Sequence, residues 1–163
     1  MFWTNHGLMK SEKNFLERLA DAVPGLKGYR ARDEARETDQ RLREYLAMRL
    51  EGVNHGLDEA KKTALSGGGL AAMGAFDGLD ARLATVTGKL RHGRQGYSGV
   101  FDQVKIKEAE LAHLYELDTG LIGLVDQLEH GVKTGQPELI RSSIAALEQQ
   151  VEARKTIFDI PSA

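Results

Sequence analysis

The fold is decided by residues 104–132, which read VKIKEAELAHLYELDTGLIGLVDQLEHGV. Core-type positions recur along this segment at alternating intervals of three and four residues, a spacing that places side chains on one face of an α-helix. The positions on this face are Val104, Lys107, Leu111, Leu114, Asp118, Leu121, Val125, Leu128 and Val132. The pattern therefore predicts a long amphipathic helix with one apolar seam.

A second helix of the same kind is predicted over residues 137–158. Gly131, Gly135 and Pro137 separate the two segments, because glycine commonly ends a helix and proline is tolerated in the first turn of the next one. The seam of the second segment consists of Ile140, Ile144, Leu147, Val151, Arg154 and Phe158. We expect the two helices to form a hairpin around residues 133–136.

Helix patterns also account for the N-terminal part of the chain. Residues 31–65 and 70–91 show apolar positions at helical intervals, and the glycine run 67–69 is expected to form the turn between them. A shorter helix begins near Ser11 and is stopped by Pro24. Sustained spacing of this kind predicts an all-α fold, an antiparallel four-helix bundle (up-down-up-down) with an additional short N-terminal helix.

Length and composition bound the class of protein. The chain has 163 residues, 28% of them charged, a formal net charge of −2 and no cysteine. This length predicts a single helical-bundle domain over 1–163, in which 1–29 supply the N-terminal helix and crossover and 30–163 the four-helix core. No run approaches the ~20 apolar residues of a membrane span, and no secretory signal is recognisable, so a cytoplasmic protein is expected. Near-neutral charge argues against a nucleic-acid partner.

Two polar residues interrupt the apolar seams. Asp118 lies at a core position of the segment 104–132, and Arg154 lies at one of the segment 137–158. In a hairpin that turns near 133–136, the two side chains come within reach of each other. A buried carboxylate without a partner is costly, so we predict an ion pair between them that fixes the register of the hairpin.

Other charged pairs are expected on the surface. Glu37 and Arg41, and likewise Asp39 and Arg43, are spaced four residues apart, as in pairs that stabilise the exposed face of a helix. The sequence predicts both pairs on the outside of the helix 31–65.

A metal site is weakly suggested by Glu110 and His113. Bundles that bind two metal ions use two Glu-x-x-His motifs, and this chain has one. The seam through Leu111 and Leu114 turns His113 toward solvent. The favoured interpretation is a solvated pair and no cofactor, with a metal ligand set as the alternative.

The connection 92–103 is longer than bundle connections usually are. Basic residues surround it, and helix N-termini favour anions, so Arg91, Arg94, Tyr97 and Lys105 form a candidate binding set for an anionic surface or ligand. The alternative is structural, with Tyr97 and Phe101 closing the end of the bundle.

No paired catalytic constellation or cofactor motif is recognisable, so an enzyme is not expected. The leading hypothesis is a non-catalytic helical bundle, a scaffold or interaction module that binds another macromolecule, with a protein as the expected partner. Peripheral membrane contact is not favoured, since the acidic residues of the first helix balance its basic ones. Gly74-x-x-x-Gly78 would place two glycines on one helix face, where close packing inside the bundle is the favoured interpretation and a homo-oligomer contact is the alternative. The alternative function is a carboxylate-rich bundle that binds a metal ion or small ligand.

Overall fold

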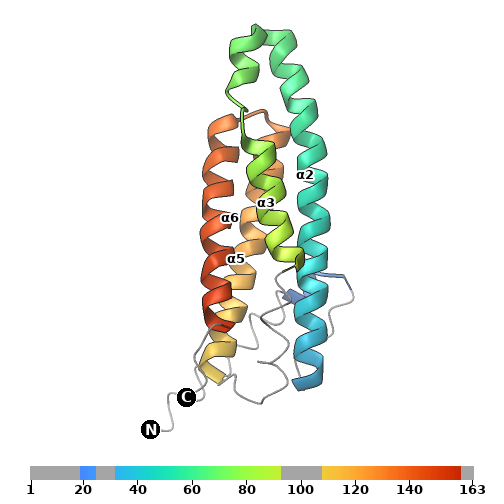
Figure 1. Cartoon of the computed structure of the whole chain (residues 1–163). Helices are drawn as coiled ribbons and strands as arrows, with labels where there is room; N and C mark the ends of the chain where they lie inside the picture. Colours follow the sequence, from blue (N-terminus) through green and yellow to red (C-terminus); the bar gives the residue numbers. More distant parts are fainter. Residues whose placement is uncertain (1–18, 25–31, 93–107, 159–163) are drawn as a thin grey trace.

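The computed structural model of the chain describes the backbone of residues 19–24, 32–92 and 108–158. Its main helices are α2 (Arg32–Gly74), α3 (Leu79–His92), α5 (Glu108–Lys133) and α6 (Pro137–Phe158), shown in Figure 1. No strand occurs within these ranges. The predicted all-α class is therefore confirmed.

The helices pack as two hairpins side by side. α2 packs on α3 and α5 packs on α6, while α2 also contacts α5 and α3 contacts α6. Chain direction alternates from helix to helix (Figure 1), so each hairpin is antiparallel. Between the hairpins the neighbours are parallel, since Arg49 of α2 meets Asp126 of α5, and further along Gly56 meets Val132. The arrangement of neighbours is thus only partly antiparallel, and α3 and α5 lie diagonally opposite.

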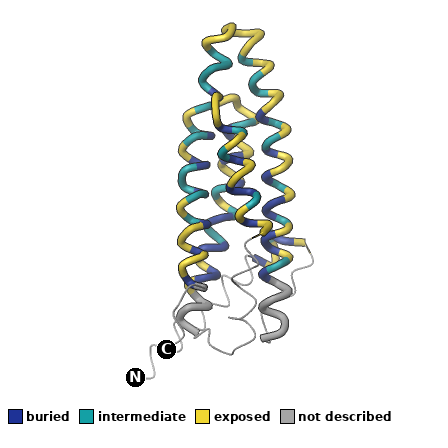
Figure 2. Tube along the Cα trace, in the orientation of Figure 1, coloured by how far each residue is buried: buried dark blue, intermediate teal, exposed yellow. Residues whose placement is uncertain are grey.

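The core forms where the apolar seams meet inside the bundle, as the buried positions along the helices in Figure 2 show. Each helix contributes a row of buried side chains at three- and four-residue intervals, as the sequence predicts. Each fully buried side chain of this size stabilises the fold by about 1.5–3 kcal/mol relative to exposure. The rows include Leu42, Leu46, Leu50, Val53, Leu57, Leu83, Val86, Leu90, Leu121, Val125, Leu128, Ile140, Ile144 and Leu147.

The described part of the N-terminal helix ends where the sequence predicts. The helix stops at Ala22, ahead of Pro24, and Leu19 and Val23 are buried in the same core as the bundle helices. Its expected start near Ser11 lies outside the described residues.

The hairpin of α2 and α3 turns at the glycine run. Gly69 has φ 74° and ψ −162°, a conformation that favours glycine, and it alone departs from helical geometry within α2. Lys61 Nζ lies 3.0 Å from Asp80 Oδ2, so the chain has reversed direction between them. The predicted helix 70–91 is not continuous, because the chain leaves helical geometry after Gly74 and re-enters it at Leu79, after Gly78 with φ 77°.

The hairpin of α5 and α6 closes with a glycine cap. Gly135 has φ 65°, its N–H donates to the carbonyl of Val132 at 3.2 Å, and the N–H of Gln136 donates to the carbonyl of Gly131 at 2.9 Å. This pair of bonds is the Schellman motif that ends many helices. The turn lies where the sequence predicts it.

Two glycines of α2 differ sharply in their surroundings. A Cβ atom at Gly56 would lie 2.8 Å from Cγ1 of Val132 on α5, whereas one at Gly52 meets nothing within 4 Å. Gly56 therefore permits the close approach of α2 and α5. α2 is helical through both positions, so the glycines do not kink it there.

We expect Gly56→Ala and Gly52→Ala to change stability in opposite directions. The first forces a methyl group against Val132 and should lower the free energy of unfolding by about 1–3 kcal/mol. The second removes a helix-breaking residue at an open position and should raise it by about 0.5–1 kcal/mol. Urea denaturation followed by circular dichroism measures both changes. Equal effects of the two variants would contradict the close-approach role of Gly56.

Candidate functional site

Four charged side chains form a buried network between three helices. Arg154 of α6 donates from Nε to Asp118 Oδ1 of α5 at 2.7 Å and from Nη2 to Asp39 Oδ1 of α2. Asp39 also accepts a hydrogen bond from Arg43 Nε at 2.9 Å. The structure thus brings together the predicted pair Asp118 and Arg154 and adds two residues of α2 to it.

The network also holds the end of α3. Arg43 Nη1 donates to the carbonyls of Leu90 at 3.2 Å and Arg91 at 3.4 Å, in the last turn of that helix. A cation is favoured at a helix C-terminus, where carbonyl groups lack partners within the helix. All four main helices are therefore tied to one charged cluster.

The prediction that Asp39 and Arg43 form a surface pair is wrong. Their exposed fractions are 1% and 5%, because position 39 continues the buried row of Leu42 and Leu46 on α2. Of the other pair predicted on the surface, Arg41 is exposed, and the side chain of Glu37 lies outside those described.

Burial dominates the electrostatics of Asp118. Complete desolvation raises the pKa of this carboxyl, and the charge and hydrogen bond of Arg154 offset that effect in part. Its second oxygen, Oδ2, has no hydrogen-bond partner among the described residues. The four side chains are sealed from solvent, so the network positions helices and offers no surface to a ligand.

Of the predicted binding set, the structure describes one residue, Arg91. Arg91 is partly exposed at the end of α3, and its guanidinium pairs with the carboxylate of Glu51 on α2. That hydrogen bond lowers the pKa of Glu51. Arg94, Tyr97 and Lys105 lie outside the described residues.

The structure adds no further described ligand to the alternative metal site of Glu110 and His113. His113 is exposed, with Nδ1 3.8 Å from Glu116 Oε2, and the side chain of Glu110 is outside those described. Among the described residues, no three His, Asp or Glu side chains lie together as a metal would need.

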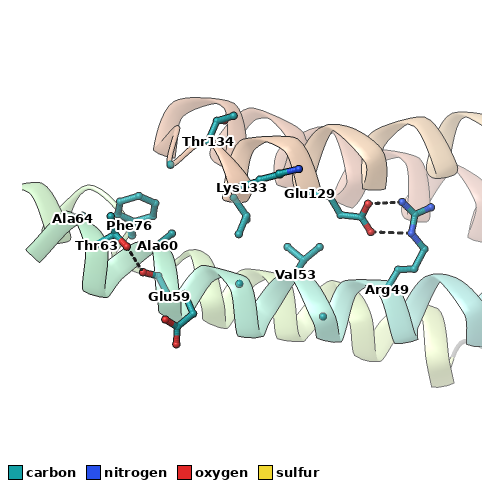
Figure 3. A pocket seen from close by; sticks show the side chains of 14 residues that line it. Arg49, Val53, Glu59, Ala60, Thr63, Ala64, Phe76, Glu129, Lys133 and Thr134 are labelled. Atoms are coloured by element: carbon teal, nitrogen blue, oxygen red, sulfur yellow. Dashed lines mark hydrogen bonds and ion pairs between the residues drawn. The ribbon is translucent and has the colours of Figure 1, made fainter.

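The structure reveals a groove that the sequence analysis missed. It has a volume of about 790 Å³ and runs between α2 and the C-terminal half of α5, up to the turn before α6 (Figure 3). Small residues of α2 line it, notably Gly52, Gly56 and Ala60. The other lining residues are Arg49, Val53, Glu59, Thr63, Ala64, Phe76, Glu129, Val132, Lys133, Thr134 and Gly135.

One end of the groove is closed by an ion-pair cluster. Arg49 donates from Nε to Glu129 Oε1 at 2.9 Å and from Nη2 to Glu129 Oε2 at 2.7 Å and Asp126 Oδ1 at 2.5 Å. Figure 3 shows the paired contact with Glu129 across the groove. These bonds raise the pKa of Arg49, so its charge is held in place.

At the other end of the groove, the hairpin of α2 and α3 projects past the turn between α5 and α6 (Figure 1). We call residues 65–74 the tip. Two of its leucines are unusually exposed, Leu65 at 42% and Leu70 at 74%.

The end of the bundle is also uncharged. No ionisable side chain occurs between Lys62 and Asp77, or between Lys133 and Glu138, in a chain with 28% charged residues. We call the tip and residues 134–137 together the end surface. The uncharged run 63–76 is a sequence signal from which this surface could have been predicted, although none of the expectations above rests on it.

None of the helices, within the described ranges, combines the length and apolarity of a membrane span. Comparison with family models, with curated proteins and with solved structures found no match.

Proposed function

We propose that the protein is a non-catalytic helical bundle that binds another macromolecule through its end surface and the adjoining groove. The observation that carries this proposal is the exposure of Leu65 and Leu70 on an uncharged tip beside an open groove. Large apolar side chains left exposed together on an uncharged segment commonly mark an interaction site.

The charges around the tip favour a protein surface as the partner. Lys61 and Lys62 at its base are accompanied by Glu59, Asp77 and Asp80. Binding to an anionic membrane would call for an excess of basic residues, whereas mixed charge around an apolar centre is typical of protein interfaces.

A charge placed at the tip should abolish binding. Leu70→Glu puts a carboxylate where an apolar side chain is expected to be buried by the partner, so recovery of the partner in an affinity pull-down from the native cell should fall at least about tenfold. The residue is so exposed that the fold is not affected.

The matched control is Met48→Glu. Met48 is 58% exposed and lies on the same helix, below the tip. This variant should recover as much partner as the unchanged chain. If both variants bind equally well, or both lose the partner, the end surface is not the binding site.

A further inference from the structure

We propose that the macromolecule bound by the end surface is a second copy of this chain, joined end to end about a two-fold axis. The inference rests on the proposed function, because it names the partner of that same site. Three features of the end surface support it: its shape, the position of the groove and the distribution of charge.

The end of the molecule has the shape of a step. The hairpin of α2 and α3 forms the high side, and the turn between α5 and α6 forms the low side (Figure 1). Beyond the turn between α5 and α6, the molecule consists of the hairpin of α2 and α3 alone (Figure 1). Two such ends related by a two-fold axis fit together, because each tip then lies over the low side of the other copy and restores a four-helix cross-section. An interface of this kind is isologous and closes at two subunits.

The groove opens at the inner corner of this step. Thr63 and Phe76 line it on the side of the tip, and Thr134 and Gly135 line it on the side of the turn. Figure 3 shows the labelled residues of the two sides facing each other. A tip that descends onto the turn of another copy therefore reaches the opening of the groove. The small residues along α2 leave room there for one large apolar side chain, and Leu70 is the most exposed one available.

The charge distribution permits contact between identical surfaces. Like charges would otherwise repel when a surface meets its own copy. The end surface carries no ionisable group, and each of its margins carries one residue of each sign, Lys62 with Asp77 and Lys133 with Glu138. The groove that receives the tip is lined by two residues of each sign, Arg49 and Lys133 with Glu59 and Glu129, so the surfaces that meet carry no net charge to repel a second copy.

Sedimentation velocity over about 1 µM to 1 mM protein tests the inference, a range that suits a small interface. We expect the unchanged chain to shift from monomer to dimer across this range, Leu70→Glu to remain monomeric throughout, and Met48→Glu to behave like the unchanged chain. A dimer that survives Leu70→Glu would use another surface and would overturn the proposal.

Cross-linking tests the arrangement of the two copies. The chain has no cysteine, so Leu70→Cys and Thr134→Cys each introduce a single thiol. When the two variants carry different tags and are mixed under mild oxidation, we expect a disulfide between them, and none when Met48→Cys replaces Leu70→Cys. Absence of the first cross-link would rule out the interlocked geometry.

The two proposals fail in different ways. A chain that stays monomeric at every concentration overturns the second copy as partner, and the pull-down with Leu70→Glu and Met48→Glu still decides whether the end surface binds a different protein. A pull-down in which Leu70→Glu has no effect overturns the proposed function itself.

Discussion

Replacement of Arg154 by methionine is expected to lower the free energy of unfolding by about 3–5 kcal/mol, since it removes one side of a buried ion network. Asp118 then loses its hydrogen-bonded cation while fully buried, and among the described residues Asp39 keeps Arg43 as its cation. Methionine fills a similar volume, so the loss reflects charge more than packing. Urea denaturation followed by circular dichroism gives the change directly.

A partly buried arginine with exposed partners supplies the comparison, since the side chain of Arg49 is 16% exposed. Arg49 pairs with Asp126 and Glu129, whose side chains are largely exposed, so Arg49→Met should cost no more than about 1 kcal/mol. The double variant Arg154→Met with Asp118→Leu leaves Asp39 paired with Arg43 and should recover much of the lost stability. A cost of Arg154→Met no greater than that of Arg49→Met would show that the buried network contributes little.

Replacement of Phe76 by alanine is expected to have the second large effect, a loss of about 3–5 kcal/mol. Phe76 is 3% exposed and belongs to the core cluster against which Ala60 and Ala64 of α2 pack. Its ring holds the base of the tip in place. The loss should appear locally first, as faster amide hydrogen exchange across residues 63–79 than across α5 and α6.

Leu70→Ala is the control for this experiment. The side chain is among the most exposed apolar ones described, so its truncation should change the free energy of unfolding by less than about 0.5 kcal/mol. If Phe76→Ala accelerates exchange equally in all helices, the tip is not a separate unit of local stability.

The register of α5 and α6 could be predicted from sequence because a short turn connects them. Once the hairpin connection is placed near Gly135, counting residues outward from it brings Asp118 close to the helical turn of α6 that carries Arg154. Local connectivity leaves little freedom for another pairing. The same reasoning located the reversal of the chain at the glycine run that includes Gly69.

The part played by Asp39 and Arg43 could not be predicted in the same way. A pair four residues apart looks identical in sequence whether its face of the helix meets water or another helix. No short turn fixes α2 relative to α6, so nothing in the sequence places Arg154 beside Asp39. The groove could not be predicted for a related reason. It exists because small residues of α2 face α5, and the sequence does not show which helix packs beside α2.

The ion network also bears on the order in which the chain is made. Asp39 and Arg154 are 115 positions apart, so the first leaves the ribosome long before the second is synthesised. During that interval, Asp39 can already pair with Arg43, because the two lie one helical turn apart within α2. This local contact pairs two opposite charges on a face of the nascent α2 that α5 and α6 have not yet covered. The arrival of α6 then supplies Arg154, and Asp118 gains its cation, so the cluster is complete only when all four main helices are in place.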